Sequence, residues 1–320
     1  MSINYVDFRR AVRNSLGPAA IDVVQWLACR RDWAGAQRVG WQLGEWAYQY
    51  HARYRNRAMG NLRLAFGDEL SEVRVREIAR ESLHHVTILF VEALRLASMS
   101  DDECREISTI QGEHHLQAAL ERGQGVVAFS GHLGNWEIGA VRLIHEHYNL
   151  LPLSRPPSTR RLAAKFKEIR DKLNFPIIPV SEGLRGIFRA LKSNCIVPVM
   201  PDRFAKGQGV TVPFFGQPTH VWQTPALLHS RTGCAVLPCH SLRRPDGTFL
   251  IEIDPPVPMQ ESDDREADIV ENTARLMALL EQKIRAVPEQ YAWHYHLWRP
   301  EQPGGLPVTP TTQPQSPPAV

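Results

Sequence analysis

Two features of the sequence predict an α/β fold, with a largely parallel central sheet flanked by helices and a helical N-terminal extension. Residues 19–97 carry apolar side chains at three- and four-residue spacing, which indicates helices. From about Gly125 onward, short apolar runs alternate with amphipathic segments, as is typical of a parallel sheet with helices on its faces. We therefore expect a helical extension over residues 1–100, an α/β domain over 101–299 and a tail over 300–320.

Each expected element has its own signal in the sequence. The periodic segments of the first hundred residues predict helices over Ala19–Arg30, Ala36–Arg55 and Glu72–Ala97. Short apolar runs predict strands over Val126–Ser130, Leu150–Arg155, Pro176–Val180, Cys195–Met200, Ala235–Leu242 and Phe249–Ile253. Amphipathic segments predict helices over Asn135–Tyr148, Thr159–Leu173, Gly183–Lys192, Thr224–Thr232 and Asp264–Val287. The tail Pro300–Val320 has seven prolines in 21 residues, so we expect it to be disordered.

The composition excludes several classes of protein. With 37 basic and 34 acidic residues, the net charge of +3 is too small to indicate a nucleic-acid partner. Five cysteines without CxxC spacing predict neither a disulfide framework nor a zinc site, and they indicate a reducing compartment. No apolar run reaches the ~18 residues of a spanning helix, and no cleavable signal is visible. We expect a protein of the cytosol or of the cytosolic face of a membrane.

The stretch VVAFSGHLGNWEIGA (126–140) contains the strongest candidate for catalysis. Gly131 and Gly134 permit a tight turn, which places His132 at the carboxyl end of a strand, where open α/β sheets bind ligands. Asn135 is a good N-cap, and Glu137 falls in the first helical turn, where the helix N-terminus favours the ionised carboxylate. A neutral imidazole oriented by a carboxylate can take a proton from a hydroxyl. We predict that His132 is a general base oriented by Glu137; the alternative is that both residues are incidental to the turn.

Further polar residues are expected at the same edge of the sheet. Arg155 ends the strand LLPLSR, where its guanidinium could grip a phosphate or simply be solvated. Asp202 and Arg203 follow the strand CIVPVM, and Asp202 could orient an arginine, bind acceptor hydroxyls or cap a loop. Besides the capping role of Asn135, its backbone and that of Gly134 are candidates for holding oxyanion charge.

The motif HLGNWE (132–137) resembles the HX4E form of the motif that marks the glycerolipid acyltransferase superfamily, in particular the late lipid A biosynthesis acyltransferases. These are the lauroyl and myristoyl transferases of Gram-negative bacteria, and relatives that acylate phosphatidylinositol mannosides share their architecture. Further blocks follow the family order over roughly residues 50–300: NRAMGNLRLAFGDELS (56–71), LSRPPSTRRL (153–162), VPVMPDR (197–203), GVTVPFFGQP (209–218), TPALLHSRTGCAVLPC (224–239) and PEQYAWHYHLWRP (288–300).

The resemblance implies transfer of a fatty acyl chain from an acyl carrier protein or coenzyme A thioester to a hydroxyl of a lipid A precursor or related glycolipid. His132 would deprotonate the hydroxyl and Glu137 would hold the imidazole ring. No covalent acyl-enzyme, metal or cofactor beyond the thioester co-substrate is implied. The substrate-binding residues would be Arg155, Asp202, Arg203, Asn135 and Gly134.

The resemblance also implies contact with a membrane. Many members of the family begin with a spanning helix, for which this sequence has no sufficiently long apolar run. Instead, Trp26, Trp33, Trp41 and Trp46 lie in the first sixty residues together with nine arginines, against four acidic residues. Tryptophan prefers the lipid headgroup level and arginine attracts anionic lipid. We expect peripheral or monotopic attachment to the cytoplasmic face of the inner membrane; the alternative is that these tryptophans pack between helices.

Two other functions are open to a sequence of this kind. A catalytically idle relative could bind lipid and act as a scaffold, but such a protein needs neither His132 nor Glu137. A Cys-dependent hydrolase could use Cys195, Cys234 or Cys239. These cysteines lie within or beside apolar runs, where a free cysteine is usually inert.

Overall fold

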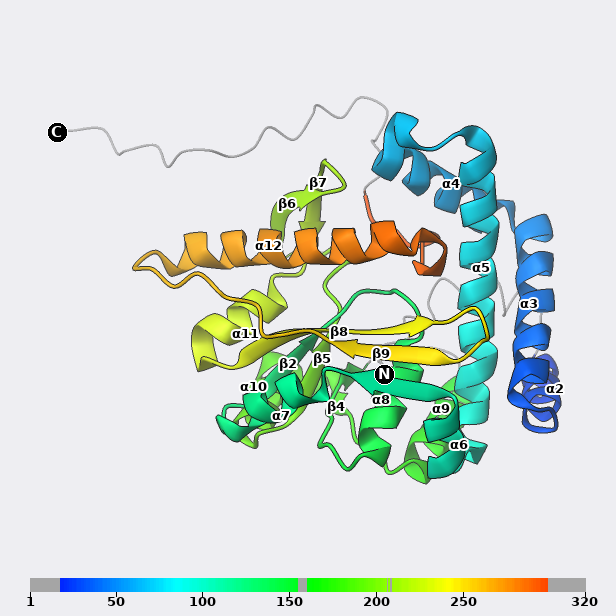
Figure 1. Ribbon diagram of the computed structural model, residues 1–320, viewed down its shortest axis with the longest axis horizontal. Coiled ribbons are helices and arrows are strands. Elements are labelled where there is room, and N and C mark those ends of the chain that lie inside the picture. Colours follow the sequence, from blue (N-terminus) through cyan, green and yellow to red (C-terminus); the bar gives the residue numbers. More distant parts are fainter. Residues whose placement is uncertain (1–17, 155–159, 206, 208, 299–320) are drawn as a thin grey trace.

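The predicted α/β fold with a helical N-terminal region is confirmed by the computed structural model, which describes residues 18–154, 160–205, 207 and 209–298 (Figure 1). The expected disordered tail and Arg155 lie outside the described residues. In Figure 1, the long helix α5 stands across one end of the sheet, and α3 runs along its outer side. The start of α3 still reaches the sheet, since the ring of Trp33 packs against Phe249 of β9.

A five-stranded sheet forms the centre of the fold, in the order β1-β9-β8-β2-β5. All pairs are parallel except the β8–β9 hairpin. Two strand pairs lie outside this sheet, the parallel pair β3–β4 and the hairpin β6–β7. The strands are β1 (Ser108–Gln111), β2 (Val126–Phe129), β3 (Leu153–Ser154), β4 (Ile178–Pro179), β5 (Ile196–Val199), β6 (Val210–Phe214), β7 (Gln217–Val221), β8 (Ala235–Arg243) and β9 (Phe249–Ile253).

Helices cover both faces of the sheet, which explains why β2 is apolar along its whole length. Val127 and Phe129 belong to a core shared with α10, α11 and α12. Val126 and Ala128 belong to a second core shared with α7, α8 and α9. The helices of this region are α6 (Asp101–Glu106), α7 (Glu113–Glu121), α8 (Trp136–His145), α9 (Arg160–Lys172), α10 (Gly183–Lys192), α11 (Thr224–Thr232) and α12 (Arg265–Ala286), with short 3-10 turns η3 (Val180–Glu182) and η4 (Pro288–Gln290).

The N-terminal region differs from the expectation at one point. The single helix expected over Ala36–Arg55 is two helices, because the backbone leaves the helical conformation at His51 (φ −103°, ψ 69°). The helices here are α2 (Pro18–Cys29), α3 (Trp33–Tyr50), α4 (Ala52–Phe66) and α5 (Glu72–Arg95), with 3-10 turns η1 (Gly67–Glu69) and η2 (Leu96–Ser98).

Glycines allow α3 to pack closely along α5. A Cβ atom added to Gly40 would lie 2.5 Å from Cα of Ile88, and one added to Gly44 would lie 2.6 Å from Cα of His84. Backbone atoms cannot move aside as a flexible side chain can. The close approach of α3 and α5 therefore depends on these two positions.

We predict that Gly40→Ala lowers the free energy of unfolding by about 1–3 kcal/mol, because the added methyl group forces the two helices apart. Gly60 of α4 is a matched control, since a Cβ atom there would meet nothing within 4 Å. Gly60→Ala should raise the free energy of unfolding by roughly 0.5–1 kcal/mol through helix propensity. Urea unfolding followed by circular dichroism measures both; a Gly40→Ala variant as stable as the wild type would contradict the packing described.

Candidate active site

The turn after β2 has the predicted strand–turn–helix geometry. Gly134 has φ +63°, and a Cβ atom there would lie 2.0 Å from the carbonyl oxygen of Ser241, so this position requires glycine. Asn135 caps α8, since its Oδ1 accepts hydrogen bonds at 3.1 Å from the backbone N–H groups of Glu137 and Ile138. The turn thus reverses the chain at the carboxyl edge of the sheet and carries His132 there.

His132 is buried and bound to Asp202 by two hydrogen bonds. Its ring Nδ1 lies 2.8 Å from Oδ1 of Asp202, and its backbone N–H donates to Oδ2 at 2.8 Å. The hydroxyl of Tyr291 donates to the same Oδ2 at 3.0 Å. A carboxylate only accepts hydrogen bonds, so Nδ1 carries the proton and Nε2 is left as the basic nitrogen. Nε2 is buried and has no hydrogen-bond partner in the part of the chain that the structure describes.

The environment of Asp202 favours its charged form. Its side chain is fully buried, and burial alone raises the pKa of a carboxyl group. The neighbouring His132 and the hydrogen bonds from His132 and Tyr291 outweigh this and hold the pKa of Asp202 below its ordinary value. An ionised carboxylate on Nδ1 stabilises the imidazolium that forms when Nε2 takes up a proton.

Strand register explains why Asp202 reaches His132. Strands β2 and β5 are parallel neighbours in which Phe129 pairs with Val199. His132 and Asp202 each lie three residues beyond this pair, so they leave the sheet side by side at the same edge. Asp202 was expected to orient an arginine, bind acceptor hydroxyls or cap a loop; the structure places it on the histidine instead.

The structure corrects the expectation that Glu137 orients the His132 ring. The carboxylate of Glu137 accepts a hydrogen bond from the indole Nε1 of Trp136 at 3.2 Å, and Nδ1 of His132 is bonded to Asp202. Its ionised state is also less favoured than expected. Burial raises the pKa of Glu137 to about 7, because desolvation outweighs the hydrogen bond from Trp136 and the charge of Arg170. Its side chain lines a cavity next to the turn that carries His132.

The backbone groups proposed for oxyanion binding are already engaged. The N–H of Gly134 donates to the carbonyl of Gln290 at 3.0 Å, and the N–H of Asn135 donates to the carbonyl of Ser241 at 2.8 Å. These two backbone N–H groups hold the turn in place and are not available to a ligand. Asn135 therefore acts as a cap and an anchor of the turn.

Arg203 and His132 both contact the ring of Tyr295. Its guanidinium carbon is 4.4 Å from the centroid of the Tyr295 ring. The same ring packs edge-on against the ring of His132, with centroids 4.9 Å apart. Tyr291 and Tyr295 were not predicted as site residues, although both lie in the segment PEQYAWHYHLWRP that resembles a family block.

A mostly apolar cavity lies between α8 and the sheet and reaches the start of α8 at Trp136 and Glu137, next to the turn that carries His132. Its empty volume is about 730 Å³, part of it open to solvent. The ring of Trp136 also packs edge-on against His132, with centroids 5.2 Å apart. Polar side chains enter the wall at Ser130, Glu137 and His240; the apolar lining includes Ala128, Leu143, Leu150, Pro152, Phe175, Pro198, Met200, Ile251 and Ile253.

A metal site and a cysteine nucleophile each place their own requirements on the described residues. No group of three or more His, Cys, Asp or Glu side chains among them could hold a metal ion. Burial raises the pKa of Cys195 and Cys234 and raises the pKa of Cys239 to about 12. A thiol with a raised pKa is a poor nucleophile at neutral pH, which disfavours the Cys-dependent hydrolase.

We predict that the buried carboxyl of Glu137 makes the protein less stable as the pH rises. Its pKa is about 7 in the folded protein against an ordinary value of 4.5. The folded state binds this proton more tightly than the unfolded state does. Its contribution to the free energy of unfolding is therefore complete below the ordinary pKa of 4.5 and is lost as the pH rises through 7. Glu137→Gln should remove up to about 3 kcal/mol of this pH dependence. Urea unfolding of both proteins at about pH 5 and about pH 8 measures it; identical pH dependence in the two proteins would contradict a neutral buried carboxyl.

Comparison with known proteins identifies the family. The profile of the family described as "Bacterial lipid A biosynthesis acyltransferase" matches residues 26–300. Similar proteins include three phosphatidylinositol mannoside acyltransferases. They come from Mycobacterium tuberculosis CDC 1551 / Oshkosh (34% identity over 155 residues, 47% of this chain and 49% of that protein), M. tuberculosis ATCC 25618 / H37Rv (36% over 135, 41% and 43%) and Mycolicibacterium smegmatis (30% over 175, 53% and 58%). The chain spans about half the length of these curated relatives. Since the profile covers most of the chain, including His132 and Asp202, the protein belongs to the bacterial lipid A biosynthesis acyltransferase family.

Proposed function

We propose that this protein transfers a fatty acyl chain from a thioester, acyl carrier protein or coenzyme A, to a hydroxyl of a membrane glycolipid. One observation carries the proposal: a buried histidine has Nδ1 bound to a carboxylate and Nε2 without a partner, beside an apolar cavity. The comparisons support it, since the family and the three relatives are acyltransferases by description.

In the proposed reaction, His132 moves one proton. Nε2 takes it from the acceptor hydroxyl while the hydroxyl oxygen attacks the thioester carbonyl carbon. The C–S bond then breaks, and the imidazolium returns the proton to the departing thiolate. Asp202 holds the ring orientation and balances the charge of the imidazolium throughout. The products are an ester and a thiol, with no acyl group on the protein.

The cavity beside α8 suits the acyl chain. Its lining is mostly aliphatic and aromatic, and each buried methylene group of a chain contributes about 0.8 kcal/mol. Glu137 enters this cavity, where its raised pKa allows a neutral form that an apolar chain tolerates better than a carboxylate. A role of Glu137 in catalysis remains a prediction.

The acceptor is proposed to be a phosphorylated glycolipid. Two head groups fit the comparisons, a lipid A precursor from the family description and a phosphatidylinositol mannoside from the names of the relatives. Arg203 and His132 contact the same aromatic ring, Tyr295, so the guanidinium is well placed to bind a phosphate of the acceptor. The sequence offers Arg155 as a second residue that could bind this phosphate.

Contact with the membrane is proposed to involve α2 and α3. Trp26 of α2 is 53% exposed and Trp41 of α3 is 46% exposed. Trp33 differs, since it is partly buried and its indole donates to the carbonyl of Gly247.

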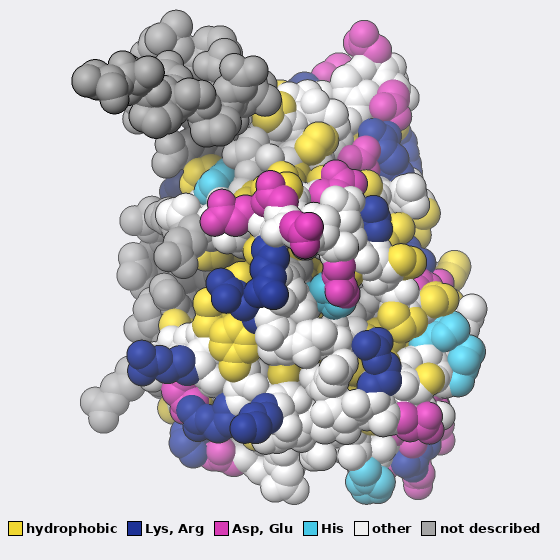
Figure 2. All heavy atoms as spheres, turned by 90° about the vertical axis from the view of Figure 1, so that its left-hand side faces the viewer, with side chains coloured by type: hydrophobic (Ala, Val, Ile, Leu, Met, Phe, Trp, Pro, Cys, Tyr) yellow, Lys and Arg dark blue, Asp and Glu magenta, His cyan; other side chains and the backbone are white. Residues whose placement is uncertain are grey.

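No described helix is long and apolar enough to cross a membrane. The face turned away from α2 and α3 carries charges of both signs around small hydrophobic patches (Figure 2). Exposed indole rings are favourable among the lipid headgroups at the membrane surface. We therefore propose peripheral attachment to the cytoplasmic face of the inner membrane.

We predict that Asp202→Asn lowers kcat by a factor on the order of 10²–10⁴, because the amide can present a donor to Nδ1 and favour the wrong tautomer. His132→Ala should abolish transfer. Thiol release from palmitoyl-coenzyme A in the presence of phosphatidylinositol mannoside or lipid A precursor, with mass spectrometry of the lipid, measures both the rate and the acceptor.

The matched control for Asp202 is Asp268→Asn. Asp268 is also buried, but its carboxylate accepts hydrogen bonds from Ser262 at the start of α12. This variant should lose stability and keep kcat. Wild-type kcat in Asp202→Asn would contradict the proposed base, and a wild-type protein that acylates neither lipid would contradict the proposed function.

We predict that Trp26→Ala/Trp41→Ala binds anionic vesicles at least about tenfold more weakly than the wild type, since burial of a large apolar side chain is worth roughly 1.5–3 kcal/mol. The control is Val180→Ala/Leu184→Ala, which removes two exposed apolar side chains of η3 and α10 on the other side of the molecule (Figure 1). Flotation with phosphatidylglycerol vesicles measures both variants. Equal flotation of the two double variants would count against attachment through α2 and α3.

A further inference from the structure

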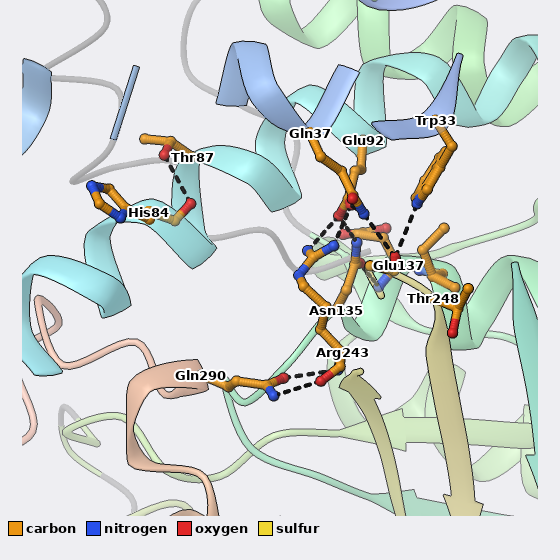
Figure 3. A network of polar contacts seen from close by, with 12 residues as sticks. Trp33, Gln37, His84, Thr87, Glu92, Asn135, Glu137, Arg243, Thr248 and Gln290 are labelled. Carbon is orange, nitrogen blue, oxygen red and sulfur yellow. Dashed lines mark hydrogen bonds and ion pairs between the residues drawn. The ribbon is translucent and has the colours of Figure 1, made fainter. Parts of the chain in front are cut away.

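A buried carboxylate on α5 connects the N-terminal helices to the catalytic turn (Figure 3). The side chain of Glu92 has no exposed surface. It accepts hydrogen bonds from Nδ2 of Asn135 at 2.7 Å, from Nε2 of Gln37 at 2.8 Å and from both terminal nitrogens of Arg243, one of them at 2.7 Å. These donors come from the start of α8, from α3 and from the end of β8. One carboxylate therefore joins three separate parts of the chain.

The charge of Glu92 is fully compensated by its partners. An isolated buried carboxylate is costly, whereas a bidentate arginine with further hydrogen bonds offsets much of that cost. The backbone of Arg243 is itself fixed, since its N–H donates to Oε1 of Gln290 and its carbonyl accepts from Nε2 of Gln290, both at 2.8 Å. Gln290 also accepts from the N–H of Gly134. The network thus holds the catalytic turn at two neighbouring residues.

Asn135 is the residue through which Glu92 reaches the turn. Its Oδ1 caps α8, and its Nδ2 donates to Glu92. An amide held at both ends cannot rotate or leave the cap without losing three hydrogen bonds. Asn135 lies three residues beyond His132, so the far end of the turn is fixed to α5 while Asp202 fixes the histidine itself.

We propose that Glu92 is a positioning residue for acyl transfer: through Asn135 it fixes the turn that aims Nε2 of His132 at the acceptor hydroxyl. This inference rests on the proposed function, because the positioned group is the proposed base. The helix α3 takes part in the same network, since Gln37 also donates to the carbonyl of Gly247 at the tip of the β8–β9 hairpin. The N-terminal helices are in this view part of the active-site framework.

Two variants separate this role from simple helix capping. Asn135→Ser keeps an oxygen that can cap α8 but removes the amide donor to Glu92. Glu92→Leu/Arg243→Leu removes both charges of the buried pair, so neither is left in the core without its partner. Neither variant changes a residue of the cavity lining. We expect kcat to fall about tenfold to a hundredfold in each, with KM for palmitoyl-coenzyme A within about twofold of the wild type.

Hydrogen exchange gives a readout that needs no activity. Both variants should exchange the backbone amides of residues 133–138 faster than the wild type, since the tether that holds them is lost. A protein that combines Asn135→Ser with Glu92→Leu/Arg243→Leu should have the kcat of the less active of the two variants, because both changes break the same contact. Fully additive losses would show that Glu92 does not act through Asn135.

The matched control is Glu45→Gln, which weakens a different contact between α3 and α5. Glu45 pairs with Arg80 at 2.7 Å and does not touch the turn. It should keep wild-type kcat and wild-type exchange in residues 133–138. If Asn135→Ser and Glu92→Leu/Arg243→Leu also keep both, the positioning role is wrong. A wild type that transfers no acyl chain overturns the proposed function instead, and exchange still decides whether Glu92 fixes the turn.

Discussion

The buried pairing of His132 with Asp202 is the interaction on which the candidate site depends. Taking a carboxylate out of water is costly, and here the cost is offset by three hydrogen bonds, two from His132 and one from Tyr291. The same bonds fix the histidine tautomer, so they leave Nε2 as the basic nitrogen. The hydrogen bonds that stabilise the buried Asp202 carboxylate therefore also set the proton position on His132. The apolar surroundings that make the buried pair costly also suit a fatty acyl chain.

Distant parts of the chain are needed to hold this pair in place. The loop after β5 supplies Asp202, the segment after η4 supplies Tyr291, and the carbonyl of Ser241 in β8 fixes the turn. The N-terminal helices contribute directly as well. Ser82 of α5 donates to the carbonyl of Tyr291 at 2.6 Å, and Glu92 holds Asn135. The region expected to serve as a membrane-associating extension is therefore also part of the framework of the site.

Local patterns predicted much of the fold and the position of His132, but they did not predict that Asp202 is its partner. Strong apolar periodicity gave correct positions for α5, α10 and α11, and the glycine-flanked turn was placed correctly because its signal is local. The break at His51, the short strand β1 and the hairpin β6–β7 were missed, since a few residues carry too little periodicity.

The partner of His132 was missed for a different physical reason. A motif suggests that residues close in sequence act together, which favoured Glu137. The true partner depends on the register of β2 against β5, a long-range property that the sequence of either strand does not reveal. Glu92 had one local signal, a carboxylate among the apolar residues of LFVEAL (89–94) in α5, where an unpaired charge would be costly.

The ring nitrogens of His132 provide the most direct measurement of this arrangement. In protein labelled with ¹⁵N in the histidine rings, the chemical shifts at neutral pH distinguish a protonated nitrogen from an unprotonated one. The structure predicts a protonated Nδ1, coupled to a proton that is protected from exchange, and an unprotonated Nε2. A proton on Nε2 with a bare Nδ1 would contradict the pairing with Asp202 and, with it, the assignment of His132 as the base.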